Sequence, residues 1–488
     1  MCKHHLRRPA RGFSLCGVTL YVLLFLPLLL AAPLWAAESP GYRPAGSPGY
    51  RPAGSPDFGA AAVPVPACAG PDAAAIAAHG PYDLPALIDM ALCRDPLTRG
   101  AWAGVRAAEA RAAQVRAAYG PQLDATLGVD GAVSRRWGGG FASGTDSSAT
   151  ASAGLSLGWL LYDFGGRAAR LDAADAARAA ALAAFADQAQ ASVLTVGVAW
   201  ADLLAALAGE EAARENLRFA EASLAAATAR EKAGVAIRSE RLQADAAAAQ
   251  AQFLLRQAEG TLLVARGRLA SALRLPPNVR LALKPPGPVE SAAVLQQSAD
   301  ALMDAAAGLR PDLALGRANL RVAAANVAAA QAARRPSLSL NARPGLSVGT
   351  TGPDVASASA GVTLAIPLGD GGGRTAVIAE ARAEAERADA NLAASEQSAA
   401  LDVWTRYQGL ATDAANLETA RRGLRSAEEA AALSQGRYRA GLAEITELLN
   451  AQSALAQARQ QMVSAELGVR QSELLLARAV GQMGEAVQ

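Results

Sequence analysis

The chain has 488 residues and a formal net charge of +2, so its charge indicates neither a nucleic-acid partner nor a strongly acidic substrate. Its length allows two or three ordinary domains or one large elongated one, and only 5% of its residues are aromatic. Alanine is abundant, which suits long helices better than a conventional core, because alanine has the highest helix propensity.

The N-terminal segment 1–36 has the three parts of a secretory signal peptide. Basic residues between Lys3 and Arg11 precede an apolar run over 15–32, and a small-residue cleavage site follows near Ala36. We therefore predict that this segment is removed from the mature protein. A retained membrane anchor is the alternative, because the apolar run is nearly long enough to span a bilayer.

Residues 37–80 form a segment rich in proline and glycine. The sequence Ser-Pro-Gly-Tyr-Arg-Pro-Ala-Gly occurs twice in it, at 39–46 and 47–54. Because such a composition cannot build a core, we predict an extended linker, to which the sequence assigns no role.

Cys68 and Cys93 are the two cysteines that remain once the signal peptide is excluded. A single pair in an exported chain predicts a disulfide, with two unpaired thiols as the alternative. His79 is then the one remaining histidine. The usual catalytic and transition-metal constellations cannot be assembled from this set, so we predict no enzyme activity, no catalytic residues, no metal and no cofactor. Carboxylate chemistry stays open, although no motif points to it.

The rest of the chain is an internal duplication. The run from Asp163 to Arg167 recurs from Asp370 to Arg374, 207 residues later. Upstream the offset is 215 residues, and the first copy therefore carries eight more residues near 137–148, in a stretch rich in glycine and serine that we predict to be a loop. We place the two structural repeats at 81–281 and 310–485, with a connecting segment at 282–309.

Each repeat begins with a helical pattern followed by two segments in which apolar and polar residues alternate. The helical stretches are 97–119 and 311–334, and a proline ends each of them. The alternating segments are 123–133, 151–161, 338–348 and 356–368. Alternation over about 10 residues is what a membrane-spanning β-strand requires. For any one segment alone, a half-solvated soluble hairpin is the alternative.

A very long helix follows the strands of each repeat. The stretches from Gly166 to Lys232 and from Gly373 to Arg439 contain no proline, and about 67 residues make a helix of roughly 100 Å. Gly234 and Gly441 end them, and second helices at 240–273 and 447–480 return antiparallel.

Four membrane strands cannot close a barrel, and open strand edges are not tolerated in lipid, so several chains must share one barrel. Two chains would give eight strands, whose interior is filled by side chains, whereas three chains give twelve and leave a lumen. Helices of about 100 Å are far longer than a bilayer is thick, so they must project into the periplasm. We therefore predict a mixed α/β channel, a trimeric twelve-stranded barrel continued by a helical tunnel.

The sequence resembles the TolC-like outer-membrane efflux and secretion proteins over about residues 80 to 485. The motifs that carry this resemblance are Ala91-Leu-Cys-Arg-Asp-Pro96, Tyr119-Gly-Pro-Gln-Leu123, Leu160-Leu-Tyr-Asp-Phe-Gly-Gly-Arg167, Tyr438-Arg-Ala-Gly-Leu-Ala-Glu-Ile445 and Leu448-Leu-Asn-Ala-Gln452. The resemblance implies a homotrimer in the outer membrane that meets a periplasmic membrane-fusion adaptor, with an inner-membrane pump driving transport.

The cysteine pair and the Leu-Cys-Arg-Asp-Pro run resemble the type I protein-secretion branch, including exporters of RTX toxins such as cyclolysin. That branch implies an ABC transporter as the pump. Multidrug or small-molecule efflux with a proton-driven pump is the alternative. A fibrous coiled-coil adhesin would also contain long alanine-rich helices, but the strands, the duplication and the two helix-breaking glycines argue against it.

The resemblance also implies roles for residues at the helix turns. It implies that the adaptor docks at the turns Gly234, Val235, Ala236, Gly441, Leu442 and Ala443. It implies a periplasmic gate in which Glu240 bonds Tyr438. A second link falls on Ser239 and Ala443, and because alanine cannot make this bond, the link is weaker unless Arg437 or Arg439 substitutes. An acidic ring falls on Glu447, with the neutral Asn450 beside it. The alternative for both glutamates is an ordinary solvated position near a helix start.

Two further features have two interpretations each. The Gly165-Gly166-Arg167 and Gly371–Arg374 runs could be mistaken for phosphate-binding loops, but they lack the residues of a P-loop, so we predict strand-to-helix transitions. Trp159 ends a predicted strand and fits either an interfacial aromatic girdle or a core position.

Overall fold

The computed structural model describes residues 80–135, 145–284, 287, 298–350 and 353–483. The chain divides into two units, Met1–Pro64 and Val65–Gln488, and all described residues belong to the second. The predicted signal peptide and nearly all of the predicted linker lie outside the described residues and stay predictions.

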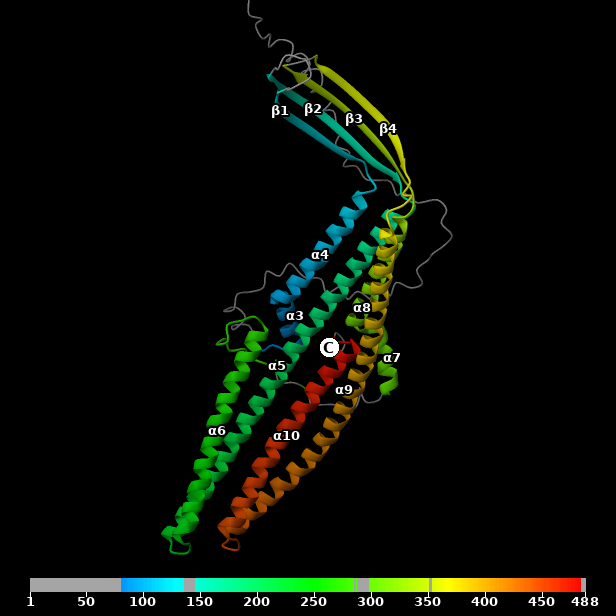
Figure 1. Cartoon of the computed structure of the whole chain (residues 1–488). Coiled ribbons are helices and arrows are strands. Elements are labelled where there is room, and N and C mark those ends of the chain that lie inside the picture. Colours follow the sequence, from blue (N-terminus) through cyan, green and yellow to red (C-terminus); the bar gives the residue numbers. More distant parts are fainter. Residues whose placement is uncertain (1–79, 136–144, 285–286, 288–297, 351–352, 484–488) are drawn as a thin grey trace, which may run out of the picture. The chain divides into compact units, whose positions relative to one another are not determined.

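In the described residues, twelve helices and strands follow one another in two copies of the same order (Figure 1). The first copy consists of α3 (Leu84–Arg94), α4 (Pro96–Ala117), β1 (Gln122–Arg135), β2 (Thr145–Tyr162), α5 (Gly166–Lys232) and α6 (Arg238–Ala272). The second consists of α7 (Ala299–Leu309), α8 (Pro311–Ala332), β3 (Ser337–Gly349), β4 (Val355–Ala365), α9 (Gly373–Arg439) and α10 (Ile445–Val480).

Helix α7 lies within the segment 282–309 that the sequence assigns to a connection. It spans 11 residues, as α3 does, and it lies 215 residues after α3, the offset that relates α4 to α8. The duplication therefore extends to a short helix before each proline. Eleven residues make only about three helical turns, which is too few for a clear periodic pattern. For this reason α3 and α7 were not predicted as helices separate from their neighbours.

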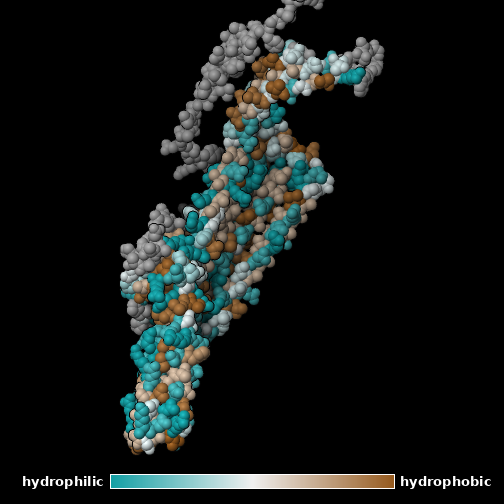
Figure 2. All heavy atoms as spheres, turned by 90° about the vertical axis from the view of Figure 1, so that its left-hand side faces the viewer, coloured by the Kyte–Doolittle hydropathy of each residue, from teal (hydrophilic) through white to brown (hydrophobic). Residues whose placement is uncertain are grey.

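The four strands form one antiparallel sheet in the order β1-β2-β3-β4. Leu123 lies opposite Leu157, and Leu338 lies opposite Leu364. Because successive side chains alternate between faces, the apolar positions of all four strands share one face of the sheet. That face is uncovered in the single chain, where Leu127 is 88% exposed, and Figure 2 shows apolar side chains exposed over the strands.

The other face of the sheet is polar. Asp124 lies opposite Ser156 and Asp130 opposite Thr150, at the positions between the apolar ones. Arg343 of β3 lies on the same face. A sheet with one apolar and one polar face is suited to separate lipid from an aqueous lumen.

Two of the apolar clusters that hold the described helices together are equivalent, one in each copy. In the first, Leu87 of α3 and Trp200 of α5 pack with Leu269 of α6. In the second, Leu302 of α7 packs with Leu410 of α9 and with α10. Helix α5 also packs against α10, which joins the two copies.

Helix α5 is the one helix in the described part of the chain whose length and composition would allow it to cross a membrane. Its most apolar 18-residue window is 44% buried, because α4, α6, α8 and α10 all pack against α5. Packing against these four helices therefore accounts for the apolar composition of α5.

Candidate functional site

Both glycine runs form strand-to-helix transitions. Gly165 and Gly372 precede α5 and α9 with φ of 101° and 94°, values that favour glycine. The backbone amide of Arg167 donates to Oδ2 of Asp163 at 2.6 Å, so the acid of each run caps the helix. The residues that the structure describes contain no group of three or more His, Cys, Asp or Glu able to hold a metal.

Trp159 lies on the apolar face of β2, near the helices. Its indole Nε1 donates to the Tyr119 carbonyl at 2.9 Å, and the residue is 39% exposed. Tyr162 and Phe164 follow it, are also exposed, and pack edge to face at 4.7 Å between ring centroids. An exposed tryptophan with a bonded nitrogen fits an interfacial girdle better than a core.

The two helix pairs, α5 with α6 and α9 with α10, each reverse at a glycine. Gly234 has φ +72° and Gly441 has φ +74°. The amide N–H of Val235 donates to the Arg230 carbonyl at 3.0 Å, and the equivalent bond closes the second turn. This glycine-ended pattern satisfies the last carbonyls of α5 and α9.

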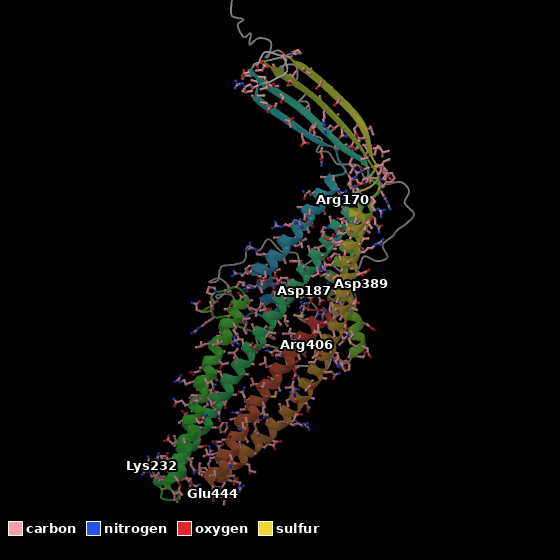
Figure 3. The ribbon with its side chains drawn as sticks, viewed as in Figure 1. Arg170, Asp187, Lys232, Asp389, Arg406 and Glu444 are labelled. Atoms are coloured by element: carbon pink, nitrogen blue, oxygen red, sulfur yellow. The ribbon has the colours of Figure 1, made fainter. Side chains whose placement is uncertain are left out.

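The tip residues present apolar side chains to solvent. Val235 is 66% exposed and Leu442 is 71% exposed. Lys232 and Glu444 lie at the same end of the helices (Figure 3). Each turn therefore has a small exposed apolar surface with a charged residue nearby.

Tyr438 of α9 ties the second helix pair to the first. It is 1% exposed, and its Oη donates to Glu240 Oε2 on α6 at 3.3 Å. Arg230 of α5 places its guanidinium carbon 4.7 Å from the Tyr438 ring centroid and donates to the Tyr438 carbonyl at 2.7 Å. Burial raises the pKa of Tyr438 and the Glu240 carboxylate raises it further, so the hydroxyl stays a proton donor.

Glu447 of α10 is paired with Arg437, whose Nη1 lies 2.7 Å from Oε1 of Glu447. Both side chains are partly exposed, at 47% for Arg437 and 40% for Glu447. Asn450 and Ser239 are exposed, and Ala443 is half-buried against the cluster around Tyr438. The structure thus brings Glu240 and Tyr438 together and gives Glu447 a partner that offsets its charge.

Asp95 is the centre of a buried polar cluster that the sequence reasoning missed. It is 2% exposed and accepts hydrogen bonds from Ser192 Oγ at 2.6 Å, Thr98 Oγ1 at 2.8 Å and Arg274 Nη2 at 2.8 Å. Burial acts to raise the pKa of Asp95, but these bonds together outweigh it and lower the pKa to about 2. The cluster fastens α4, α5 and the end of α6 together.

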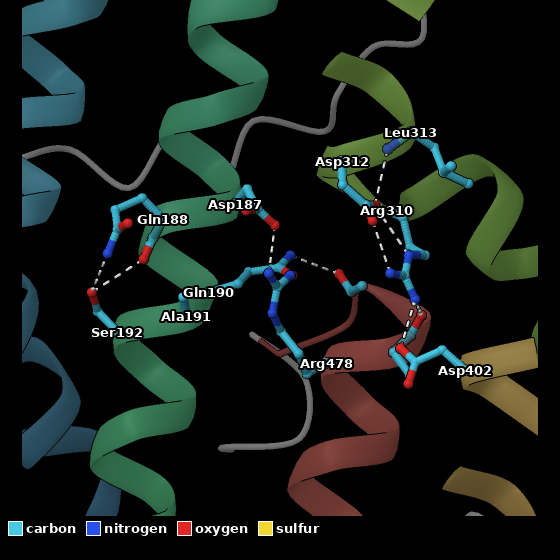
Figure 4. Close-up of polar contacts among 12 residues, drawn as sticks. Asp187, Gln188, Gln190, Ala191, Ser192, Arg310, Asp312, Leu313, Asp402 and Arg478 are labelled. Atoms are coloured by element: carbon cyan, nitrogen blue, oxygen red, sulfur yellow. Dashed lines mark hydrogen bonds and ion pairs between the residues drawn. The ribbon is translucent and has the colours of Figure 1, made fainter. Parts of the chain in front are cut away.

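The duplicate position of Asp95 is Arg310, 215 residues later. Its guanidinium donates to Asp312 at 2.8 Å, to Asp402 at 3.1 Å and to the Ala479 carbonyl at 2.9 Å (Figure 4). The same place in the two copies therefore holds charges of opposite sign.

Cys93 of α3 is disulfide-bonded. The predicted partner Cys68 lies outside the described residues. The pairing of these two cysteines stays a prediction.

Arg230 is a contact of Tyr438 that the sequence reasoning missed. Its duplicate is Arg437, 207 residues later, so one arginine stands near the end of each long helix. That recurrence was the available signal. Its two different partners, Tyr438 for Arg230 and Glu447 for Arg437, depend on how the helices pack.

Comparison with known proteins gives consistent results. Residues 87–273 and 302–482 match the family described as Outer membrane efflux protein. The chain is 30% identical to Protein CyaE of Bordetella pertussis over 403 residues, which cover 82% of this chain and 84% of CyaE. Among solved structures, the outer-membrane channel OprN has a TM-score of 0.71 at 23% identity, covering 84% of this chain and 96% of OprN. The outer-membrane protein VceC of Vibrio cholerae has a TM-score of 0.70 at 21% identity, covering 82% and 96%.

Proposed function

Because the chain belongs to the outer membrane efflux protein family and is a channel-tunnel subunit of the outer membrane, we propose that it forms a homotrimeric conduit for type I protein secretion. The observation that carries the proposal is the sheet with one apolar and one polar face, whose strands lead directly into helices of 67 residues. At 1.5 Å per residue such helices reach roughly 100 Å, far beyond a bilayer.

The trimer is supported by the free edges of the sheet. Among the described strands, β1 and β4 each pair on one side only. Unpaired backbone groups are not tolerated in lipid, so β4 of one chain must pair with β1 of the next chain. Two chains would give eight strands, whose interior is filled by side chains, whereas three chains give twelve strands and leave an open lumen.

The duplication predicts the register of this pairing. Within the chain, β2 pairs with β3, and Leu157 lies opposite Ala342. Strand β4 is the duplicate of β2, and β1 is the duplicate of β3, so the same pairing places Leu364 opposite Leu127 of the partner subunit. Both side chains then lie on the lipid-facing side.

The proposed partners are a periplasmic membrane-fusion adaptor at the tips and an inner-membrane ABC transporter. The type I branch is supported by the cysteine pair and the Leu-Cys-Arg-Asp-Pro run at 92–96, and by the likeness to CyaE over most of both chains. Multidrug efflux with a proton-driven pump is the second candidate, and the description of the family as outer membrane efflux proteins supports it.

A deletion strain tests the function. We expect loss of an exported protein from the culture medium and unchanged sensitivity to drugs and dyes, with export restored to the parental level by the intact chain supplied in trans. Native mass measurement of the purified protein in detergent should give three chains. Increased drug sensitivity with unchanged export would assign the chain to efflux, and a stable monomer would contradict the shared barrel.

We also propose that two groups of residues form the periplasmic gate. One is Tyr438 with its contacts Glu240 and Arg230, and the other is the Arg437–Glu447 pair. Tyr438→Phe removes a bond to a carboxylate, an interaction of about 1.5 kcal/mol or more, and should raise conductance in planar bilayers roughly tenfold. Tyr407→Phe is the control, because Tyr407 lies half-buried on the same helix, away from the tips.

Charge variants test the second part of the gate. Glu447→Ala should reduce cation selectivity and weaken block by multivalent cations, whereas Arg437→Ala should increase both by freeing the carboxylate. Equal selectivity in both variants and the parent would place the gate elsewhere.

A further inference from the structure

The contact between the two copies within one chain provides a template for the contact between chains. This inference rests on the shared barrel proposed above. Helix α5 packs against α10 within the chain. When the barrel closes, the duplicate of α5, which is α9, meets the duplicate of α10, which is α6 of the partner subunit. A residue of α5 maps to α9 by adding 207, and a residue of α10 maps to α6 by subtracting 207.

The contact within the chain has two notable parts. Gln190 Nε2 of α5 donates to the Gly481 carbonyl at 3.0 Å, and Arg478 of α10 donates to Gln190 Oε1 at 2.8 Å (Figure 4). Farther along α5, Leu474 of α10 fills the space that Gly197 leaves, since a Cβ added at Gly197 would lie 2.8 Å from Cδ1 of Leu474. A large side chain on α10 is thus matched by glycine on α5.

At the duplicate positions large and small residues are exchanged. Trp404 of α9 stands where α5 has Gly197, and Gly267 of α6 stands where α10 has Leu474. Trp404 is 46% exposed in the single chain, which is a large uncovered apolar surface. Gly267 is half-buried, and a Cβ added there would be in ordinary van der Waals contact with Pro277, at 3.6 Å from its carbonyl oxygen, so Pro277 borders the surface that this glycine leaves open.

One of the two polar bonds of the contact can be repeated, whereas serine (Ser271) stands at the duplicate position of Arg478. Gln397 is the duplicate of Gln190 and is exposed in the single chain, while Arg274 is the duplicate of Gly481. Arg274 and Gly481 both have positive φ, of 57° and 90°, and both follow the end of a returning helix. The backbone conformation at the carbonyl that accepts the Gln190 amide within the chain is therefore repeated at Arg274, where the contact between chains is expected.

We propose that Trp404 packs over Gly267 of the partner subunit and that Gln397 donates to the backbone carbonyl of the partner's Arg274. Leu263 and Val264, which are 61% and 55% exposed on α6, are then covered as well. The joint within a chain and the joint between chains place the bulky residue on opposite helices. The contact within a chain and the contact between chains therefore differ chemically, so neither helix pair can take the place of the other. The order of the helices around the tunnel is fixed for this reason.

Three variants of the full-length protein test the contact. Trp404→Ala removes the bulky side chain, and Gly267→Leu fills the space that Trp404 needs. Each should lower the temperature at which the purified trimer dissociates by roughly 10 °C, the shift that loss of a buried aromatic side chain gives. The double variant restores a bulky residue facing a small one, as at Leu474 and Gly197, and should recover most of the loss.

Phe253→Ala is the matched control, because Phe253 is 63% exposed on α6 and its duplicate Gln460 is exposed within the chain. A parent that is not a trimer would contradict the assembly itself. A trimeric parent whose single variants dissociate at the parental temperature would overturn the Trp404 contact alone. A double variant no more stable than Gly267→Leu would also overturn it.

Discussion

Replacing Asp95 by alanine should destabilise the helical region by about 3 kcal/mol, because it leaves buried donors without an acceptor and Arg274 without its partner. Arg274 has a positive φ of 57°, which is unfavourable for a residue with a side chain, and the ion pair with Asp95 helps to hold it there. We expect a lower thermal midpoint by circular dichroism in detergent and faster proteolysis.

The effect of pH follows from the same carboxylate. The pKa of Asp95 is about 2 in the folded protein against 3.8 for the ordinary side chain, so its contribution is fully present above about pH 4. It is lost as the pH falls toward 2. The stability difference between Asp95→Ala and the parent should therefore narrow over this range, which acid titration of the thermal midpoint measures.

Asp89→Asn is the control for the loss of a charge, because Asp89 is exposed on α3, the helix that ends just before Asp95. It should leave the free energy of unfolding within about 0.5 kcal/mol of the parent's. An Asp95→Ala protein that melts with the parent would mean that the cluster does not fasten α4, α5 and α6 together.

Gly441→Trp should reduce export at least about tenfold, the change that 1.4 kcal/mol of lost adaptor binding gives. A Cβ at Gly441 meets nothing within 4 Å, so the indole would project from the tip and block a docking partner. Secreted protein per amount of trimer in the outer membrane is the measurement.

Gly441→Asn separates docking from backbone strain. Gly441 has φ +74°, which asparagine adopts more readily than most residues, so this variant keeps the turn and adds little bulk. It should export at nearly the parental level. Equal loss of export in both variants would assign the effect to the turn conformation, and normal export by Gly441→Trp would place the adaptor elsewhere.

Much of the fold could be predicted from local sequence signals. The bounds of α5 and α9 agree with the predicted ones, because a glycine with positive φ precedes each helix and another follows it, with no proline between. The sheet could be predicted because strict alternation of apolar and polar residues, repeated in four segments, is typical of strands with one apolar face. The family assignment is confirmed by the match over 87–273 and 302–482.

The contacts at the tips could be predicted only in part. The resemblance placed Tyr438 near Glu240, but it did not include Arg230, which contacts both the ring and the carbonyl of Tyr438. It implied an acidic ring at Glu447, which stays a prediction, and it did not include the ion pair that Arg437 makes with Glu447 in the single chain. Such pairings depend on the rotation of each helix about its axis, and a periodic pattern does not fix that rotation to within one side chain.

The opposite charges at Asp95 and Arg310 have an evolutionary consequence. If gene conversion copied the Asp95 region into the second copy, leucine would replace Asp312 and the new carboxylate would stand beside Asp402, while Gly481 would offer no guanidinium where the first copy has Arg274. Two acids would then share one partly buried place with no guanidinium from Arg310 between them, which is unfavourable. The two halves can therefore exchange this region only together with α5, α6 and their duplicates.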